Sequence, residues 1–166
     1  MRILIAYATK SGTTAKAAQL LANELQKHTV TLANLAETAP VPGDFDYIVM
    51  GGPIRAGKVH PALRRYVKAN EAAIAAVPHT LFVCCAYGEM LGDYLQMSYP
   101  ASIRDTAEEM LNFGGELDVS KQKGWDKLIT RMMRNSILED EDGDQLLPCL
   151  LPEHIRLLAD RLRVRT

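Results

Sequence analysis

The 166-residue sequence lacks most features that mark a specialised class of protein. It has only three cysteines, Cys84, Cys85 and Cys149, and they form no CxxC pair or metal-ligand spacing. This excludes a disulfide framework and favours buried, reduced thiols in a cytoplasmic chain. No apolar run suits a signal peptide or approaches the ~20 residues of a membrane span. The net charge of −1 gives no indication of nucleic-acid binding.

Several familiar site motifs are also missing. The sequence contains neither the Walker pattern GxxxxGK[ST] nor the dinucleotide pattern GxGxxG, and it has no GxSxG nucleophile elbow. The acidic stretch at residues 139–144 lacks the register of a calcium loop, so we interpret it as a solvated loop and expect no metal site. A site in this protein must therefore be built from less conspicuous residues.

What the sequence does contain is an alternation of strands and helices. Its length predicts one domain, residues 1–166. Strands are expected at residues 2–8, 29–35, 46–51, 80–86 and, more weakly, 116–120; helices are expected at 13–27, 61–76, 102–113, 125–138 and 152–162. Such alternation predicts a five-stranded parallel sheet with helices on both faces. Ligands bind at the carboxyl ends of such strands, which directs attention to the loops at 9–14, 51–60 and 86–99.

The loop after the first strand is rich in hydroxyl groups. An apolar run stops at Ala8, and small or hydroxylated residues then lead into a helix. A helix N-terminus carries about half a positive charge and presents free backbone N–H groups, so it suits an anion. An ordinary helix cap would use the same residue types. The number of hydroxyls favours a phosphate site made of Thr9, Lys10, Ser11, Gly12, Thr13 and Thr14.

Three segments together resemble a known family. YATKSGTT resembles the flavodoxin phosphate loop, whose pattern is [TS]-x-[TSD]-G-x-T. VMGGPIRAGKVH, at residues 49–60, resembles the loop after the third flavodoxin strand, and its Ile-Arg-x-Gly-x-x-His run is similar to the flavodoxin-like protoporphyrinogen dehydrogenase family. ELDVSKQKGWDKLITRMMRN resembles the segment after that family's fifth strand. The resemblance implies a flavodoxin-like, doubly wound α/β fold that holds FMN.

The resemblance also implies which residues surround the flavin ring. The loop after the third strand has Arg55 where flavodoxins commonly place an aromatic side chain. Its guanidinium either lies over the ring and offsets an anionic reduced flavin, or is solvated and pairs with Glu89 or Asp93. Gly57 suits a peptide that flips between redox states, and His60 either caps a helix or contacts a substrate. Tyr94 is the favoured stacking residue. The implied ring contacts are Pro53, Ile54, Arg55, Ala56, Gly57, Ala86, Tyr87, Gly88 and Tyr94.

Three functions follow from this pattern as alternatives. The first is an FMN-dependent oxidoreductase that passes electrons from a reduced, tetrapyrrole-like substrate to a quinone-like acceptor. The second is a flavodoxin carrier that transfers electrons between redox partner proteins, and the third is a phosphate-binding module without redox activity. The helix expected at residues 125–138 begins at Trp125 and ends at Leu138. Its apolar stripe, flanked by Lys and Arg, either covers the sheet edge or forms a docking surface for a membrane face, a quinone or a partner protein.

Overall fold

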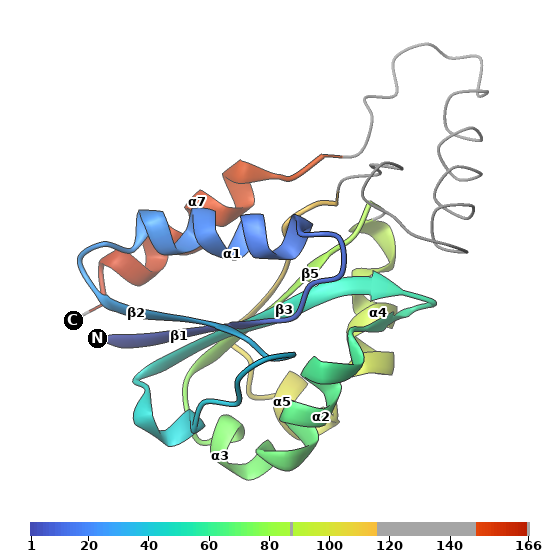
Figure 1. Cartoon of the computed structure of the whole chain (residues 1–166), viewed down its shortest axis with the longest axis horizontal. Coiled ribbons are helices and arrows are strands. Elements are labelled where there is room, and N and C mark those ends of the chain that lie inside the picture. Colours follow the sequence, from blue (N-terminus) through green and yellow to red (C-terminus); the bar gives the residue numbers. More distant parts are fainter. Residues whose placement is uncertain (87, 116–148, 166) are drawn as a thin grey trace.

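The chain folds around a parallel sheet covered by helices on both faces (Figure 1). The computed structural model describes residues 1–86, 88–115 and 149–165. The strands are β1 (Arg2–Tyr7), β2 (Thr29–Asn34), β3 (Tyr47–Arg55), β4 (Lys58–Val59), β5 (His79–Cys84) and β6 (Glu109–Asn112). The helices are α1 (Thr13–Glu24), α2 (Pro61–Ala69), α3 (Glu71–Ala75), α4 (Leu91–Ser98), α5 (Ala101–Arg104) and α7 (Pro152–Arg163).

Five of the described strands pair in parallel in the order β2–β1–β3–β5–β6. The central strand β1 reads RILIAY, and its residues 3–6 are fully buried, as expected for a strand covered on both faces. From β1 the chain crosses to β2 on one side and then to β3 on the other. The carboxyl ends of β1 and β3 therefore lie at the switch point of the sheet, where doubly wound folds bind their ligands.

The two faces of the sheet form two separate cores. In Figure 1, α1 and α7 lie over one face, and α2 to α5 lie over the other. Alternate residues of each strand serve alternate cores: Ile5 and Phe82 pack under α1 and α7, whereas Leu4 and Leu81 pack under α2 and its neighbours. The Phe82 ring stacks on Phe113 with centroids 4.6 Å apart. This layering confirms the α/β fold predicted from the sequence.

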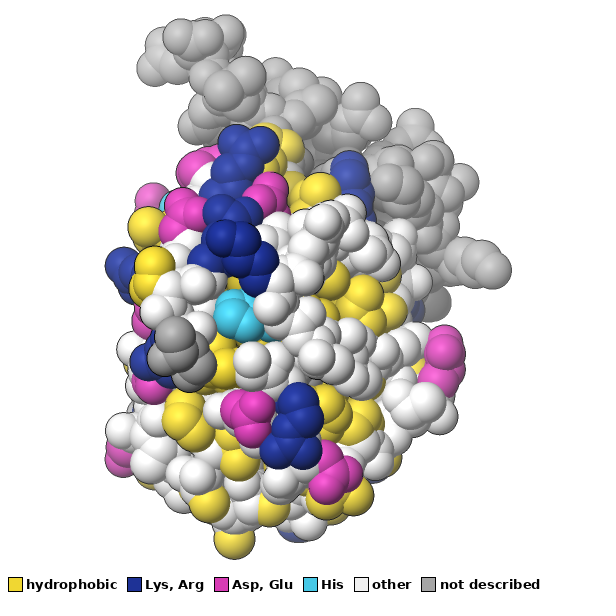
Figure 2. Space-filling view, turned by 90° about the vertical axis from the view of Figure 1, so that its left-hand side faces the viewer, with side chains coloured by type: hydrophobic (Ala, Val, Ile, Leu, Met, Phe, Trp, Pro, Cys, Tyr) yellow, Lys and Arg dark blue, Asp and Glu magenta, His cyan; other side chains and the backbone are white. Residues whose placement is uncertain are grey.

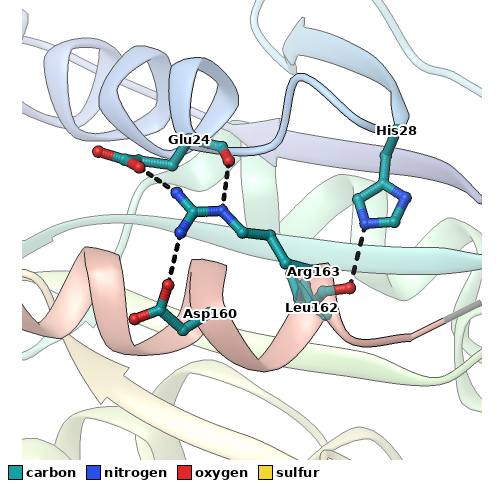
Figure 3. A network of polar contacts seen from close by, with 5 residues as sticks. All are labelled: Glu24, His28, Asp160, Leu162 and Arg163. Atoms are coloured by element: carbon teal, nitrogen blue, oxygen red, sulfur yellow. Dashed lines mark hydrogen bonds and ion pairs between the residues drawn. The ribbon is translucent and has the colours of Figure 1, made fainter.

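A polar clamp joins the two helices of one face. Figure 3 shows the Arg163 guanidinium of α7 between Glu24 of α1 and Asp160 of its own helix. Arg163 Nε also donates to the backbone oxygen of Glu24 at 2.9 Å, and His28 Nε2 lies 3.1 Å from the backbone oxygen of Leu162. These contacts hold the last turn of α7 against the end of α1, far from the switch point.

Two sequence expectations about helices were wrong. The helix expected at residues 102–113 is α5 followed by the edge strand β6, so the fifth parallel strand is Glu109–Asn112. The helix expected at residues 61–76 divides into α2 and α3 at Asn70, whose side chain donates to the Tyr66 carbonyl at 2.9 Å. A side chain that competes for a helical carbonyl ends the helix there.

Two loops expected at the carboxyl edge contain regular structure. Strand β3 extends four residues beyond the predicted end at residue 51 and returns as β4 in an antiparallel hairpin. The loop expected at residues 86–99 contains a 3₁₀ turn, Gly88–Met90, and helix α4. The strand expected at 116–120, the helix expected at 125–138 and the acidic loop at 139–144 lie outside the described residues, as does Tyr87.

Candidate functional site

The hydroxyl-rich loop closes over the N-terminus of α1. Gly12 adopts a left-handed conformation at φ 91°, and its N–H donates to Thr9 Oγ1 at 3.0 Å. No side chain caps α1 and no acidic residue lies in its first turn, so its N-terminal dipole charge is uncompensated. A side chain built on Gly12 would meet no atom within 4 Å, which leaves open space beside the backbone. A tetrahedral anion fits this arrangement.

Thr14 lies beneath this loop with a hydroxyl that lacks a hydrogen bond. The side chain is 1% exposed, and Thr14 Oγ1 has no hydrogen-bond partner among the described residues. The Cys84 thiol, a weak donor, is its polar neighbour. An unpartnered buried hydroxyl costs free energy, and a phosphate oxygen accepting from it would recover that cost. The residues present therefore fit a phosphate group.

Burial makes the thiol of Cys84 unreactive. Removal from water raises the pKa of its thiol to about 12, against a smaller opposing effect of the Thr14 hydroxyl. A thiol that stays protonated is a poor nucleophile, so Cys84 serves packing, as the sequence indicated. Cys85 is half-buried and Cys149 is exposed, which corrects the expectation that all three cysteines are buried.

The segment after β3 is a tight hairpin rather than an open loop. Ile54 pairs with Val59 and Arg55 pairs with Lys58, so Ala56 and Gly57 form a two-residue turn. Both turn residues have positive φ, 48° at Ala56 and 76° at Gly57, as a type I′ turn requires. Glycine adopts this conformation freely, but alanine is strained in it. The structure thus places the conformational stress at the tip of the expected flavin loop.

Helix α4 supports this hairpin. Val59 N–H donates to the buried Ser98 hydroxyl at 3.0 Å. A side chain built on Gly57 would lie 3.0 Å from Met97 Cε, so the methionine rests against the turn. Neither contact could be expected from the sequence, because residues 91–98 were expected to be loop.

His60 is a helix cap in this structure. Its Nδ1 accepts from the Ala62 N–H at 3.2 Å at the start of α2. Its Cβ also lies 3.8 Å from the position a Cβ on Gly52 would take, which sets it at the carboxyl end of β3. Burial lowers the pKa of His60, and the charges of Arg65 and Lys10 lower it further. The charge of Lys10 in the phosphate loop therefore acts on the imidazole, whose structural role is to cap α2.

The loop after β5 is held by Asn112, which sequence reasoning missed. Its Oδ1 accepts from Cys85 N–H at 3.4 Å and from Gly114 N–H at 2.9 Å, and its Nδ2 donates to the Cys85 carbonyl at 3.2 Å. Ala86 follows directly and is half-buried, whereas Gly88 is exposed. Tyr94 lies in the first turn of α4, with its hydroxyl 3.6 Å from Met90 Sδ. Its stacking role stays a prediction.

An open cavity of about 540 Å³ lies behind the same loop. Its lining includes Ala86, Gly88, Leu111, Asn112 and His154. His154 Nδ1 lies 2.7 Å from the Asn112 carbonyl, which can only accept, so Nδ1 carries the proton. The cavity is mainly apolar and borders the β5 loop on the side of the edge strand β6.

Three sequence-predicted segments thus meet at one edge of the sheet. Tyr7 of β1 pairs with Gly51 of β3, and Pro53 of β3 pairs with Cys84 of β5, so the following segments are neighbours. The Ala8 N–H donates to the Gly51 carbonyl at 3.3 Å and joins the phosphate loop to β3. The predicted contacts at residues 9–14, 53–57, 86 and 88 all belong to these segments. Among the described residues, no group of three potential metal ligands occurs.

The parallel strands have the order β2–β1–β3–β5–β6, which is 2-1-3-4-5 when the short antiparallel β4 is left out of the count, and the hydroxyl-rich turn lies at the switch point. This is the arrangement of flavodoxin-like doubly wound α/β proteins. The family model for the flavodoxin domain matches residues 4–144. The chain belongs to the flavodoxin domain family, and this membership supports FMN as its cofactor.

Solved structures agree with this fold. The flavodiiron core of Flv1 from Synechocystis sp. PCC6803 is similar at 21% identity and a TM-score of 0.54, over 68% of this chain and 30% of that one. A flavodoxin from the domain Archaea is similar at 12% identity and a TM-score of 0.50, over 84% of this chain and 97% of that one. The chain thus spans less than a third of the flavodiiron core.

One comparison found no match, and the described helices show no membrane span. The search of curated proteins found no match to the chain. None of the described helices has the length and apolar character needed to cross a lipid bilayer.

Proposed function

We propose that this protein is an FMN-dependent oxidoreductase of the protoporphyrinogen dehydrogenase type. It takes electrons from a reduced, tetrapyrrole-like substrate and passes them to a quinone-like acceptor. The observation that carries the proposal is the β3–β4 hairpin, in which the Ile-Arg-x-Gly run places Arg55 beside a strained Ala56–Gly57 turn. A cation at this position favours the anionic reduced flavin, in contrast with the aromatic residue that flavodoxins commonly have there.

Each segment of the edge has a part in this proposal. The amides and hydroxyls of residues 9–14 hold the cofactor phosphate, and the buried Thr14 hydroxyl supplies a donor that otherwise lacks a partner. The hairpin and the Asn112-held loop after β5 bound the ring on two sides. When bound, FMN supplies the one- and two-electron chemistry. The protein would position the flavin, and Arg55 would supply a positive charge beside it.

A flavodoxin electron carrier is the second candidate. Family membership supports it directly, and so does a fold similar to the archaeal flavodoxin over most of both chains. The two candidates differ in their reaction partners. An oxidoreductase turns over a reduced small molecule, whereas a carrier exchanges electrons with proteins alone.

The test is an anaerobic assay on purified protein that has been reconstituted with FMN. Visible absorbance first establishes whether flavin is bound; a colourless protein would leave only the phosphate-binding module. A porphyrinogen, the reduced form of a porphyrin, is then added with a soluble quinone. Porphyrin fluorescence and quinone reduction are recorded together. We expect both signals, and we expect Arg55→Gln to slow them while its flavin content remains equal. Flavin reduction by proteins but not by porphyrinogen would favour the carrier.

A further inference from the structure

The outward face of helix α2 carries positive charge and no negative charge. The helix buries Ala62, Leu63, Tyr66 and Val67 against the sheet. Its exposed positions follow the helical period and are Pro61, Arg64, Arg65, Lys68 and Ala69. Lys58 of β4 is exposed immediately before the helix. One surface next to the hairpin therefore presents four cations, Lys58, Arg64, Arg65 and Lys68, which we call the α2 basic face.

Several of the other basic residues of the described chain are ion-paired, and these four are not. Ion pairs there join Arg2 to Asp46, Arg161 to Glu109, Arg163 to Glu24 and Asp160, and Arg165 to Glu108. Figure 2 shows the side of the molecule that bears the termini, where Lys and Arg side chains lie among Asp and Glu. No ion pair found among the described residues involves the α2 basic face. Its charge is therefore available to an external partner.

The α2 basic face lies beside the candidate flavin site. His60 caps α2, and its pKa is lowered first by burial and then by Arg65 and by Lys10 of the phosphate loop. Arg65 and the phosphate loop thus act on the same imidazole. At the turn of the hairpin, Met97 is 47% exposed, and its Cε would lie 3.0 Å from a Cβ on Gly57. A flexible methionine at the turn suits an adaptable protein contact.

We propose that the α2 basic face docks an acidic patch on a redox partner protein and brings its redox centre to the hairpin tip. This inference goes beyond the proposed oxidoreductase: it rests on the second candidate function, electron exchange with a redox partner protein, and identifies that partner by its charge. Uncompensated charge of one sign accelerates the encounter with a surface of the opposite sign and orients the complex. The exposed positions of α2 hold no large apolar side chain that would insert into lipid, which favours a protein over a membrane surface.

The test uses a reduced acidic ferredoxin as electron donor to the oxidised FMN-loaded protein, followed by stopped-flow at low ionic strength. We expect the double variant Arg64→Glu, Lys68→Glu to lower the second-order rate constant about tenfold and to remove its decline with salt. The matched control carries Lys27→Glu and Arg156→Glu, which change the net charge by the same amount. Lys27 follows α1 and Arg156 lies on α7, the two helices over the opposite face of the sheet; both side chains are exposed, and neither has an ion pair among the described residues. The control should change the rate constant less than about twofold.

Other measurements separate this proposal from the proposed function. Flavin content and the rate of reduction by dithionite should be equal in all three proteins. Ferredoxin affinity, measured by calorimetry on apo and loaded protein, should fall in the double variant in both states. Because this binding needs no flavin, it tests the docking surface even if the protein proved not to hold FMN.

Three results would overturn the proposal. The double variant and the control could bind ferredoxin equally well. Both could lose binding to the same extent, which would show a general charge effect. Or the double variant could lose binding to phosphatidylserine vesicles while its rate with ferredoxin stayed unchanged, which would identify the α2 basic face as a lipid-binding surface. The charge-conserving variant Arg64→Lys should behave as the parent protein, because the proposed docking depends on positive charge and not on the geometry of the guanidinium group.

Discussion

The Asn112 carboxamide holds both backbone polar groups of Cys85, with Oδ1 accepting from its N–H at 3.4 Å and Nδ2 donating to its carbonyl at 3.2 Å. Through this pair the edge strand β6 fixes the loop that follows β5. Asn112→Ala removes the carboxamide. The N–H and carbonyl of Cys85 and the N–H of Gly114 then lose their hydrogen bonds to this side chain. We expect a loss of about 1–3 kcal/mol in the free energy of unfolding and a faster release of FMN. Chemical denaturation and flavin fluorescence measure the two effects.

A matched control for Asn112 lies elsewhere in the fold. Asn70→Ala removes a different side chain-to-carbonyl bond, at the end of α2. It should lower stability without changing the FMN release rate. Equal release rates in both variants would contradict a specific role of Asn112 in shaping the β5 loop.

The hairpin tip gives a prediction about backbone strain. Gly57→Ala places a Cβ at φ 76° and 3.0 Å from Met97 Cε, and should lower the free energy of unfolding by about 1–2 kcal/mol. Ala56→Gly relieves the strain at φ 48°, partly offset by greater chain entropy, and should leave stability unchanged or raised by up to about 1 kcal/mol. Thermal unfolding of the two variants checks these signs. A greater loss for Ala56→Gly than for Gly57→Ala would contradict the turn assignment.

An ion pair at the amino edge of the sheet gives a prediction about stability at low pH. Asp46 accepts from Arg2 N–H at 2.6 Å and from its guanidinium at 3.0 Å, and these hydrogen bonds hold the pKa of Asp46 below its ordinary value. A depressed carboxylate pKa stabilises the fold above the unfolded pKa and loses that contribution as the pH falls. Asp46→Asn should therefore flatten the decline in melting temperature below about pH 4. A decline that is identical in parent and variant would show that Asp46 contributes nothing to acid stability.

Much of the fold could be predicted because the central strands are apolar and well punctuated. The segments at β1, β3 and β5 read as buried strands, and the hydroxyl-rich turn after β1 was evident from its composition. The edge strand β6 could not be predicted, because its four residues continue the apolar spacing of Ile103 and Ala107 and resemble a helix. Gly114 and Gly115 follow this segment, and a glycine there is also typical of a helix end. In the structure, side chains there would overlap Cys149 and Cys85.

The site was less predictable than the sheet because part of it depends on contacts distant in sequence. Ala-Gly is a weaker hairpin signal than Asn-Gly, so the turn at residues 56–57 gave little indication of β4. The support from Ser98 and Asn112 comes from 39 and 27 residues away, respectively. Local sequence patterns were enough to locate the site, but its shape depends on hydrogen bonds between residues distant in sequence.

The buried Thr14 hydroxyl gives a prediction that separates phosphate binding from folding. Thr14→Val replaces an unpartnered buried oxygen with a methyl group, so the apo protein should be as stable as the parent or more stable. FMN affinity should fall by about 1–3 kcal/mol, and Ser11→Val should act in the same direction. Riboflavin, which lacks the phosphate, should bind the variants as it binds the parent. If both ligands lost affinity equally, the hydroxyls would support the loop and not the phosphate.

The most direct test of the account is the identity and affinity of the flavin. Saturate the purified protein with an equal mixture of FMN, FAD and riboflavin, remove the excess, denature the complex and weigh the released flavin by mass spectrometry. The uncapped N-terminus of α1 and the hydroxyls of residues 9–14 predict FMN alone, because one phosphate fits and no second dinucleotide-binding half is present in the described fold. Release of FAD, of FMN and riboflavin in equal amounts, or of no flavin would contradict the account.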